Sequence, residues 1–176
     1  MQIPCHRPIW CNHAFSMIQY YRGQSRAVAD IFHSAIHQTA AALYTPKQIQ
    51  AWAPLPINYE YWRARCELKR PFLWEDDDGT VGGFLELDSD GHVDCHYTHP
   101  DFNRRGIGSA LLRHAIQIAT DMALPRLYVE ASHLAKGLYL KHGFEVVRAN
   151  EETRNGVALQ NWIMERHTAD QTPAGG

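Results

Sequence analysis

A short loop in the middle of the chain carries the residue types that bind phosphate. It contains Arg104, Arg105, Gly106 and Gly108, and an amphipathic helix is predicted to start at Ile107. The first N–H groups of a helix have no partner within the helix and lie at the positive end of its dipole. Glycine lets a ligand approach these groups, although two glycines are also typical of close helix packing. The spacing favours a cradle for an anion such as a diphosphate.

The strand predicted directly before this loop carries groups that can exchange protons. His92, Asp94 and His96 alternate, which predicts that they share one face of the strand, with Cys95 on the other face, unless a β-bulge re-aims them. Histidine titrates near neutral pH and can accept a proton directly or through water, whereas an aspartate needs a raised pKa or a water relay. A solvent-facing polar strand and a metal cluster that includes His99 are the alternatives.

The helices that must position these groups follow from apolar periodicity and capping residues. In the helix after the loop, apolar residues recur every three or four positions, at Ile107, Leu111, Ala115, Ile118 and Met122. Capping residues predict a helix after Ser25, one from Thr45 to about Trp52, and one from about His133 to His142 after Ser132; a fourth covers residues 59–69.

Strands are predicted between the helices and at both ends of the helical region. The segments are residues 17–24, 71–76, 81–88, 92–98, 126–132, 144–152 and 157–166. Turns at residues 77–79 and at Asn155-Gly156 predict hairpins. Strands alternate with helices in the middle, and antiparallel hairpins flank them. This order predicts an α/β fold with a mixed central sheet flanked by helices.

Length and composition predict one domain. The chain has 176 residues, of which 45% are hydrophobic and 20% are charged, as in an ordinary globular domain. We place the domain at residues 16–166, with an irregular extension over residues 1–15 and a flexible tail over residues 167–176.

Charge and hydropathy exclude several partners. The net charge is −2 and basic residues are scattered, so a nucleic-acid partner is not expected. No apolar run approaches the roughly 18 residues of a membrane span, and residues 1–10 lack a secretory core. We therefore expect a cytoplasmic protein without a membrane partner. Its four cysteines are far apart, and the terminal set Cys5, His6, Cys11 and His13 matches no usual zinc pattern, so we predict no metal site.

Two sequence blocks carry a resemblance to a known family. YTHPDFNRRGIGSALL, residues 97–112, resembles the acetyl-CoA signature of the GNAT superfamily of N-acetyltransferases. VEASHLAKGLYLKHGF, residues 129–144, is similar to a later motif of the same family. YTPKQIQAWA and part of the second block are similar to the YafP-like bacterial branch. The resemblance implies the GNAT acyl-CoA N-acyltransferase fold and acetyl-CoA as co-substrate.

The resemblance also implies which residues hold the coenzyme. They are Tyr97, Thr98, Asn103, Arg104, Arg105, Gly106, Ile107, Gly108, Ser109 and Ser132. In the family the loop amides bind the pyrophosphate, and the strand end pairs with the pantetheine arm through its backbone. Asn103 departs from the usual Gln or Arg, which puts little in doubt because that contact is largely main-chain. Ser132 contacts pantetheine or only caps a helix, and both interpretations stay open.

The catalytic residues implied by the resemblance are Tyr139, His92 and Asp94. Tyr139 stands where similar proteins have the general acid that protonates the departing thiolate, and a tyrosine is protonated at neutral pH. Packing on the sheet is the alternative role for this ring. His92 lies where several relatives carry a catalytic glutamate, and we expect it or Asp94 to act as the base.

Together these features predict an enzyme that transfers an acetyl group from acetyl-CoA to a primary amine by direct attack in a ternary complex. A non-catalytic acyl-CoA sensor and a metal-dependent hydrolase are the alternatives. Five aromatic residues either line an acceptor pocket for an aromatic or apolar amine or belong to the core; they are Trp52, Tyr59, Tyr61, Trp62 and Trp74. The sequence leaves open whether the chain forms a homodimer.

Overall fold

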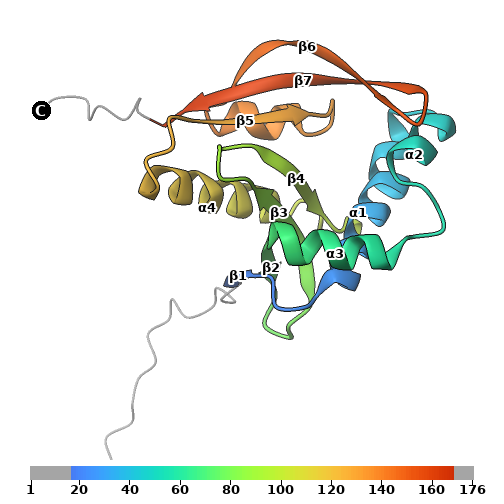
Figure 1. Cartoon of the computed structure of the whole chain (residues 1–176), viewed down its shortest axis with the longest axis horizontal. Helices are drawn as coiled ribbons and strands as arrows, with labels where there is room; N and C mark the ends of the chain where they lie inside the picture. Colours follow the sequence, from blue (N-terminus) through green and yellow to red (C-terminus); the bar gives the residue numbers. More distant parts are fainter. Residues whose placement is uncertain (1–16, 169–176) are drawn as a thin grey trace, which may run out of the picture.

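The computed structural model describes residues 17–168 of the chain (Figure 1). The predicted extension over residues 1–15, the set of cysteines and histidines in it, and the tail after residue 168 lie outside the described residues. Among the described helices, none combines the length and the apolar character needed to cross a membrane.

The elements follow the predicted order closely. The strands are β1 Met17–Tyr20, β2 Phe72–Glu75, β3 Val81–Leu87, β4 Val93–Thr98, β5 Arg126–Ala131, β6 Glu145–Arg154 and β7 Val157–His167. The α-helices are α1 Ser25–Ser34, α2 Pro46–Trp52, α3 Tyr59–Lys69, α4 Ile107–Asp121 and α5 Lys136–Lys141. A π-helical turn η1 Ala35–Thr39, and two 3-10 turns, η2 Ala40–Ala42 and η3 Pro100–Phe102, complete them.

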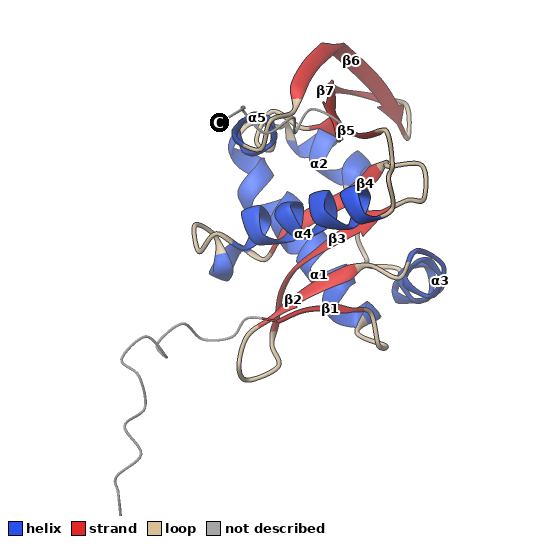
Figure 2. Ribbon diagram, turned by 90° about the vertical axis from the view of Figure 1, so that its left-hand side faces the viewer, coloured by secondary structure: helices blue, strands red, loops and turns tan. Residues whose placement is uncertain are grey.

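The strands form two antiparallel sheets that meet between β4 and β5. The first sheet has the order β1-β2-β3-β4 and the second the order β5-β7-β6 (Figures 1 and 2). Within the described residues, a parallel bridge between His92 and Tyr128 joins the two sheets. Beyond this bridge a cavity of about 60 Å³ lies between β4 and β5. The predicted α/β fold, with strands flanked by helices, is confirmed.

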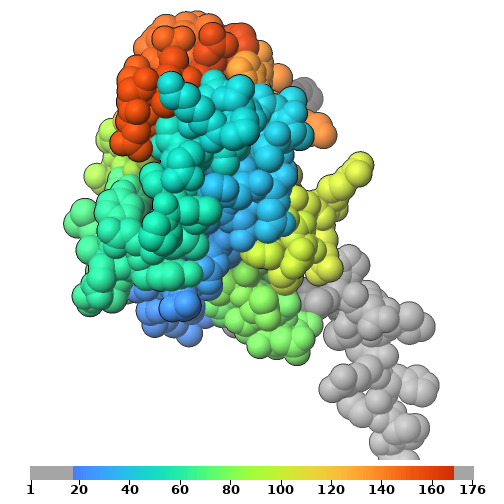
Figure 3. All heavy atoms as spheres, turned by 90° about the vertical axis from the view of Figure 1, so that its right-hand side faces the viewer, coloured from blue at the N-terminus to red at the C-terminus, as the bar shows by residue number. Residues whose placement is uncertain are grey.

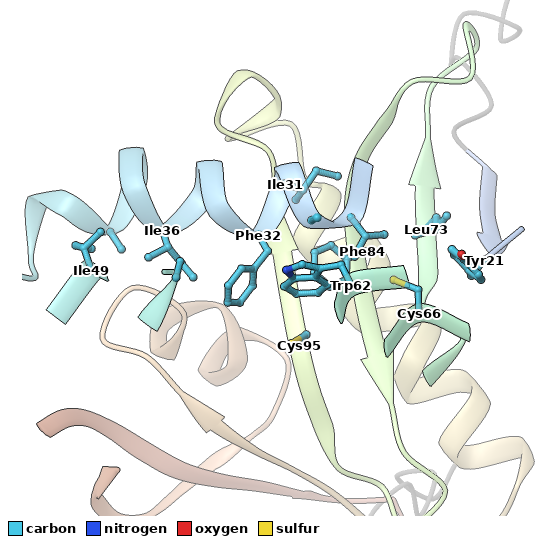
Figure 4. Close-up of a cluster of buried hydrophobic side chains, with 14 of the residues drawn as sticks. Tyr21, Ile31, Phe32, Ile36, Ile49, Trp62, Cys66, Leu73, Phe84 and Cys95 are labelled. Carbon is cyan, nitrogen blue, oxygen red and sulfur yellow. The ribbon is translucent and has the colours of Figure 1, made fainter. Parts of the chain in front are cut away.

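Alternate residues of the first sheet face two separate hydrophobic cores. Leu73 and Phe84 pack with α1 and α3 on one face (Figure 4). Leu85 and Val93 pack with α4 on the other face, where α5 and β5 complete the core. Burying these apolar faces is the main favourable term in holding the helices to the sheet.

The tip of the β6–β7 hairpin docks against α2. Asn155 and Gly156 both have positive φ, at 49° and 72°, as the predicted Asn-Gly turn requires. Asn155 donates a side-chain hydrogen bond to the Ala51 carbonyl at 3.3 Å, and Gln48 donates one to the Ala158 carbonyl at 3.2 Å. Figure 3 shows this face, on which the hairpin lies against the α2 segment. The contact brings the second sheet and the early helices together around β4.

Two predicted helix starts are wrong, and one is confirmed. Ser25 is the first residue of α1 rather than its cap. The helix expected from His133 starts at Lys136, because the preceding residues form a turn in which Ser132 accepts a hydrogen bond from the Ala135 amide at 3.3 Å. The Thr45 prediction is confirmed, since its hydroxyl and the Gln48 side chain form a capping box.

A buried ion pair fixes α3 against the first sheet. Glu86 of β3 is fully buried, with 0% of its surface exposed. Arg65 of α3 donates to both its carboxylate oxygens, at 3.0 and 2.5 Å. Arg65 also donates to Asp94 of β4 at 2.8 Å. A buried carboxylate is tolerated only when it is paired in this way, so the side chain of Arg65 determines where α3 lies.

We predict that Arg65→Met lowers the free energy of unfolding by about 3–5 kcal/mol, because it leaves Glu86 buried without a partner. Urea unfolding followed by circular dichroism measures the change. The double variant Arg65→Met with Glu86→Leu removes both charges and is expected to recover most of the loss. An Arg65→Met protein as stable as the wild type would contradict this role.

Candidate active site

The predicted anion loop ends in the left-handed backbone conformation that glycine favours. Gly106 has a φ of 80° and is the N-cap of α4. Arg104 also has a positive φ of 64°, and both arginine side chains of the loop are exposed. The first amides of α4 therefore lie beside two exposed guanidinium groups, of which that of Arg105 lies over the Phe102 ring at 4.9 Å, and this arrangement suits a phosphate.

The first turn of α4 approaches the end of β4 closely because Gly108 has no side chain. A Cβ atom there would lie 3.2 Å from Leu138 of α5, 3.5 Å from His96 Nε2 and 3.8 Å from Thr98 Oγ1. Gly108 of the loop and Thr98 at the end of β4, both predicted to contact the coenzyme, are thus neighbours. Helix packing and a ligand site both explain this glycine, and the two explanations do not exclude each other.

Tyr139 points toward the cavity between β4 and β5. Its side chain is 1% exposed and lines that cavity together with His96. The Tyr139 hydroxyl lies 3.1 Å from His96 Nδ1, at hydrogen-bonding distance. Burial raises the pKa of Tyr139 further above its ordinary value near 10, so the phenol keeps its proton at neutral pH.

One extra residue in β4 decides which side chains share a face. The register of β3 with β4 shifts, so that Asp94 and Cys95 together lie opposite Glu86. Arg65 accordingly contacts both, at 2.8 Å from the Asp94 carboxylate and 3.4 Å from the Cys95 sulfur. The expectation that His96 shares a face with Asp94, and that Cys95 faces the opposite way, is wrong. After the bulge His96 faces α4 and α5.

His96 is a neutral imidazole in this site. Burial lowers its pKa to about 4, because the cation would be poorly solvated there. Its Nε2 atom is buried and, among the described residues, has no hydrogen-bond partner. Sequence reasoning did not connect His96 with Tyr139, because strict alternation along β4 places it elsewhere.

His92 lies between two carboxylates. Its Nε2 atom is 2.6 Å from Glu130 of β5, and its Nδ1 atom is 3.6 Å from Asp88. The hydrogen bond to Glu130 raises the pKa of His92 above its ordinary value, and the same contact lowers the pKa of Glu130. The Glu130 carboxylate thus favours the protonated form of His92, which lies between β4 and β5.

Asp94 is held as an anion by two cations. Burial alone would raise its pKa, but Lys69 and Arg65, both 2.8 Å away, outweigh burial and lower it. A direct base would need the opposite shift. Asp94 and His92 remain near each other, since both line one hollow of about 390 Å³.

The other predicted coenzyme residues surround the loop and the strand end. Asn103 donates to Thr39 at 3.3 Å, so its side chain links the loop to η1. The Ser109 hydroxyl is 3.0 Å from His142 Nε2, a contact that joins the start of α4 to the end of α5. Ser132 lines the β4–β5 cavity, and the Tyr97 ring stacks on Phe84 with centroids 5.7 Å apart.

Known proteins are similar to this chain in sequence. A family model described as the acetyltransferase (GNAT) domain matches residues 40–166. The uncharacterized N-acetyltransferase YafP of Escherichia coli (strain K12) is 27% identical over 145 residues, which cover 82% of this chain and 91% of YafP. YedL of the same organism is 39% identical over 79 residues, covering 41% of this chain and 50% of YedL.

Solved structures show the same fold. A GCN5-related N-acetyltransferase from Rhodopseudomonas palustris superposes with a TM-score of 0.80 at 27% identity, covering 86% of this chain and 95% of that chain. The acetyltransferase yncA from Salmonella typhimurium, solved with acetyl-CoA, has a TM-score of 0.63 at 18% identity. The match covers 92% of this chain and 98% of yncA.

We predict that the pKa of His92 lies above the ordinary histidine value of roughly 6.5 and that the pKa of His96 lies below it. An NMR titration of the imidazoles is expected to place His92 above that value and His96 at about 4. Glu130→Gln keeps the shape but removes the charge, so the pKa of His92 falls. The stability that the pair contributes is present below the unfolded pKa and is lost as pH rises through the folded pKa. An unchanged His92 titration in Glu130→Gln would exclude this pairing.

Proposed function

Because the chain belongs to the GNAT acetyltransferase family, we propose that it transfers the acetyl group of acetyl-CoA to a primary amine by direct attack in a ternary complex. The amine nitrogen forms a bond to the carbonyl carbon, the carbon–sulfur bond breaks, and the thiolate takes a proton. The observation that supports this best is the buried Tyr139 hydroxyl, which lines the cavity between β4 and β5 beside the start of α4.

The donor would lie across the loop and the strand end. The amides from Gly106 to Ser109 would bind the pyrophosphate, with Arg104 and Arg105 adding charge. The pantetheine arm would enter the cavity between β4 and β5, where the strands are not paired beyond the His92–Tyr128 bridge in the described chain. Backbone groups at the end of β4 could then pair with its amides as a strand does.

Tyr139 would protonate the departing thiolate. The hydrogen bond with His96 would orient the Tyr139 hydroxyl for this step. If Nδ1 of the neutral His96 carries the ring hydrogen, it donates to the phenol oxygen and leaves the phenol hydrogen free for the sulfur. The same N–H would stabilise the phenolate that forms. This contact opposes burial, which alone makes Tyr139 a weaker acid.

His92 would take the proton of the ammonium group, directly or through water. The hydrogen bond to Glu130 raises the pKa of His92, so its neutral form is a stronger base than a free imidazole. Asp94 would remain an anion and attract the ammonium group rather than accept its proton, which its two cationic partners support. We also propose a cytoplasmic location, which the two buried free thiols Cys66 and Cys95 support.

We predict that Tyr139→Phe lowers kcat by about 100-fold, the low end of what general acid catalysis contributes. Affinity for acetyl-CoA stays nearly unchanged, because the ring remains and the loop is untouched. Release of free thiol measures kcat, and calorimetry measures affinity. Unchanged turnover would remove Tyr139 from the mechanism. Acetyl-CoA binding without thiol release from the wild type with any amine would favour the non-catalytic sensor.

We predict that the double variant Arg104→Ser with Arg105→Ser weakens acetyl-CoA binding by about 3- to 10-fold, because exposed charges contribute at most about 1 kcal/mol. The loss shrinks at high salt. Arg22→Ser is the matched control, since Arg22 is also exposed but lies before α1. If the wild type gives neither heat nor thermal protection with acetyl-CoA, the loop is not a coenzyme site.

A further inference from the structure

Two hollows on one side of β4 lead to the proposed reaction point. The smaller has a volume of about 390 Å³ and the larger about 590 Å³. Both are lined by Trp52, Asp94 and Tyr97, and these same residues line the cavity that holds Tyr139. An acceptor in either hollow can therefore bring its amine to the gap between β4 and β5.

Aromatic rings form the wall of the larger hollow. Phe32, Tyr61 and Trp62 line it in addition to Trp52 and Tyr97. Figure 4 shows the rings of Phe32 and Trp62 lying together beneath α1, beside β4. Their centroids are 4.7 Å apart at an interplanar angle of 52°, and the Phe32–Tyr97 pair is 4.9 Å apart. Such walls bind flat apolar groups by burial and edge-to-face contact.

Of the five aromatic residues considered from the sequence, three line this hollow and two do not. Trp52, Tyr61 and Trp62 line it. Tyr59 instead hydrogen-bonds Asp30 at 2.7 Å, and Trp74 packs against Phe102. Trp52, Tyr61 and Trp62 also pack against other rings, so what sets them apart from Tyr59 and Trp74 is that they line the hollow.

The two arginines in the wall of the larger hollow are already paired. Arg65 binds Glu86 and Asp94. Arg154 binds Glu152 through two hydrogen bonds of 2.9 and 3.2 Å. The carboxylate partners offset both positive charges, so the hollow favours an acceptor body that carries no carboxylate or phosphate.

Carboxylates gather instead in the smaller hollow. Asp94, Glu130 and Glu152 line it, together with amide side chains such as Asn161. Each of the three carboxylates already has a cationic partner, but a carboxylate can accept about four hydrogen bonds, so it can also bind an ammonium group. The charged and apolar walls thus meet at Asp94 and Tyr97, next to Tyr139.

We propose that the acceptor is a primary arylalkylamine, whose aromatic body occupies the larger hollow while its amine lies beside Asp94 and Glu130. This inference rests on the proposed function and names the substrate class of the same site. The product would be the N-acetyl arylalkylamine together with free CoA. A small alkylamine would leave the aromatic wall uncovered and bind less tightly.

The test follows free thiol release by the full chain with acetyl-CoA and four amines: 2-phenylethylamine, n-butylamine, spermidine and a short peptide with one lysine. We expect kcat/KM for 2-phenylethylamine to exceed that of n-butylamine by about 10- to 100-fold, because the ring leaves water. Higher kcat/KM for spermidine or the peptide would overturn the arylalkylamine assignment and leave acetyl transfer intact. No release with any amine would overturn both proposals.

A matched pair of variants links this preference to the hollow. Tyr61→Ala is expected to raise KM for 2-phenylethylamine by about 3- to 10-fold with kcat little changed. Tyr61 is 54% exposed, so its loss should not prevent folding, and Tyr61→Phe should restore KM because it keeps the ring. Tyr20→Ala is the control, since Tyr20 is 56% exposed on β1 at the far edge of the sheet. Equal KM values in Tyr61→Ala and Tyr20→Ala would contradict the assignment.

Discussion

The pairing of β3 with β4 shifts by one residue opposite the buried Glu86, and the polar geometry of the site depends on that shift. A strict ladder would alternate faces along β4 and would send His96 toward α3. With the bulge, Asp94 and Cys95 both reach Arg65, while His96 turns to Tyr139. The strand therefore supplies an anion to one side and a neutral imidazole to the other. The buried Arg65–Glu86 pair stabilises the bulge, because it satisfies the carboxylate that lies opposite it.

The separation of β4 from β5 is the second constraint on the site. It begins beyond His92, in the same part of β4 as the bulge. A bridge at His92 and Tyr128 joins the strands at one end, and the His92–Glu130 contact reinforces it there. Further along, the side chains of Tyr139 and His96 occupy the space between the sheets. Strands that part in this way leave backbone groups of β4 available to a ligand. A sheet that stayed paired along its length would have no place for a pantetheine arm.

Much of the fold could be predicted from the sequence, because its signals are local. The stripe from Ile107 to Ala115 in α4, the Thr45 capping box and the Asn155-Gly156 turn each depend on residues within a few positions of one another. Met122, predicted to extend the stripe, is exposed at the end of the helix. The start of α5 could not be predicted, since Ser132 resembles a cap in sequence but forms a turn in space. The faces of β4 could not be predicted either. A bulge depends on what lies across the sheet, here Glu86 and Arg65, and no local pattern in the strand reveals it.

The site can be understood as two electrostatic environments kept apart by one strand. On the side of α3, Lys69 and Arg65 lower the pKa of Asp94, and Glu130 raises the pKa of His92, so charged forms are favoured. On the side of α4 and α5, burial lowers the pKa of His96 and raises that of Tyr139, so neutral forms are favoured. In the proposed reaction, the ammonium group would lose a proton to the first environment and the thiolate would gain one from the second. Because the two environments lie on opposite faces of β4, each can be tuned without disturbing the other.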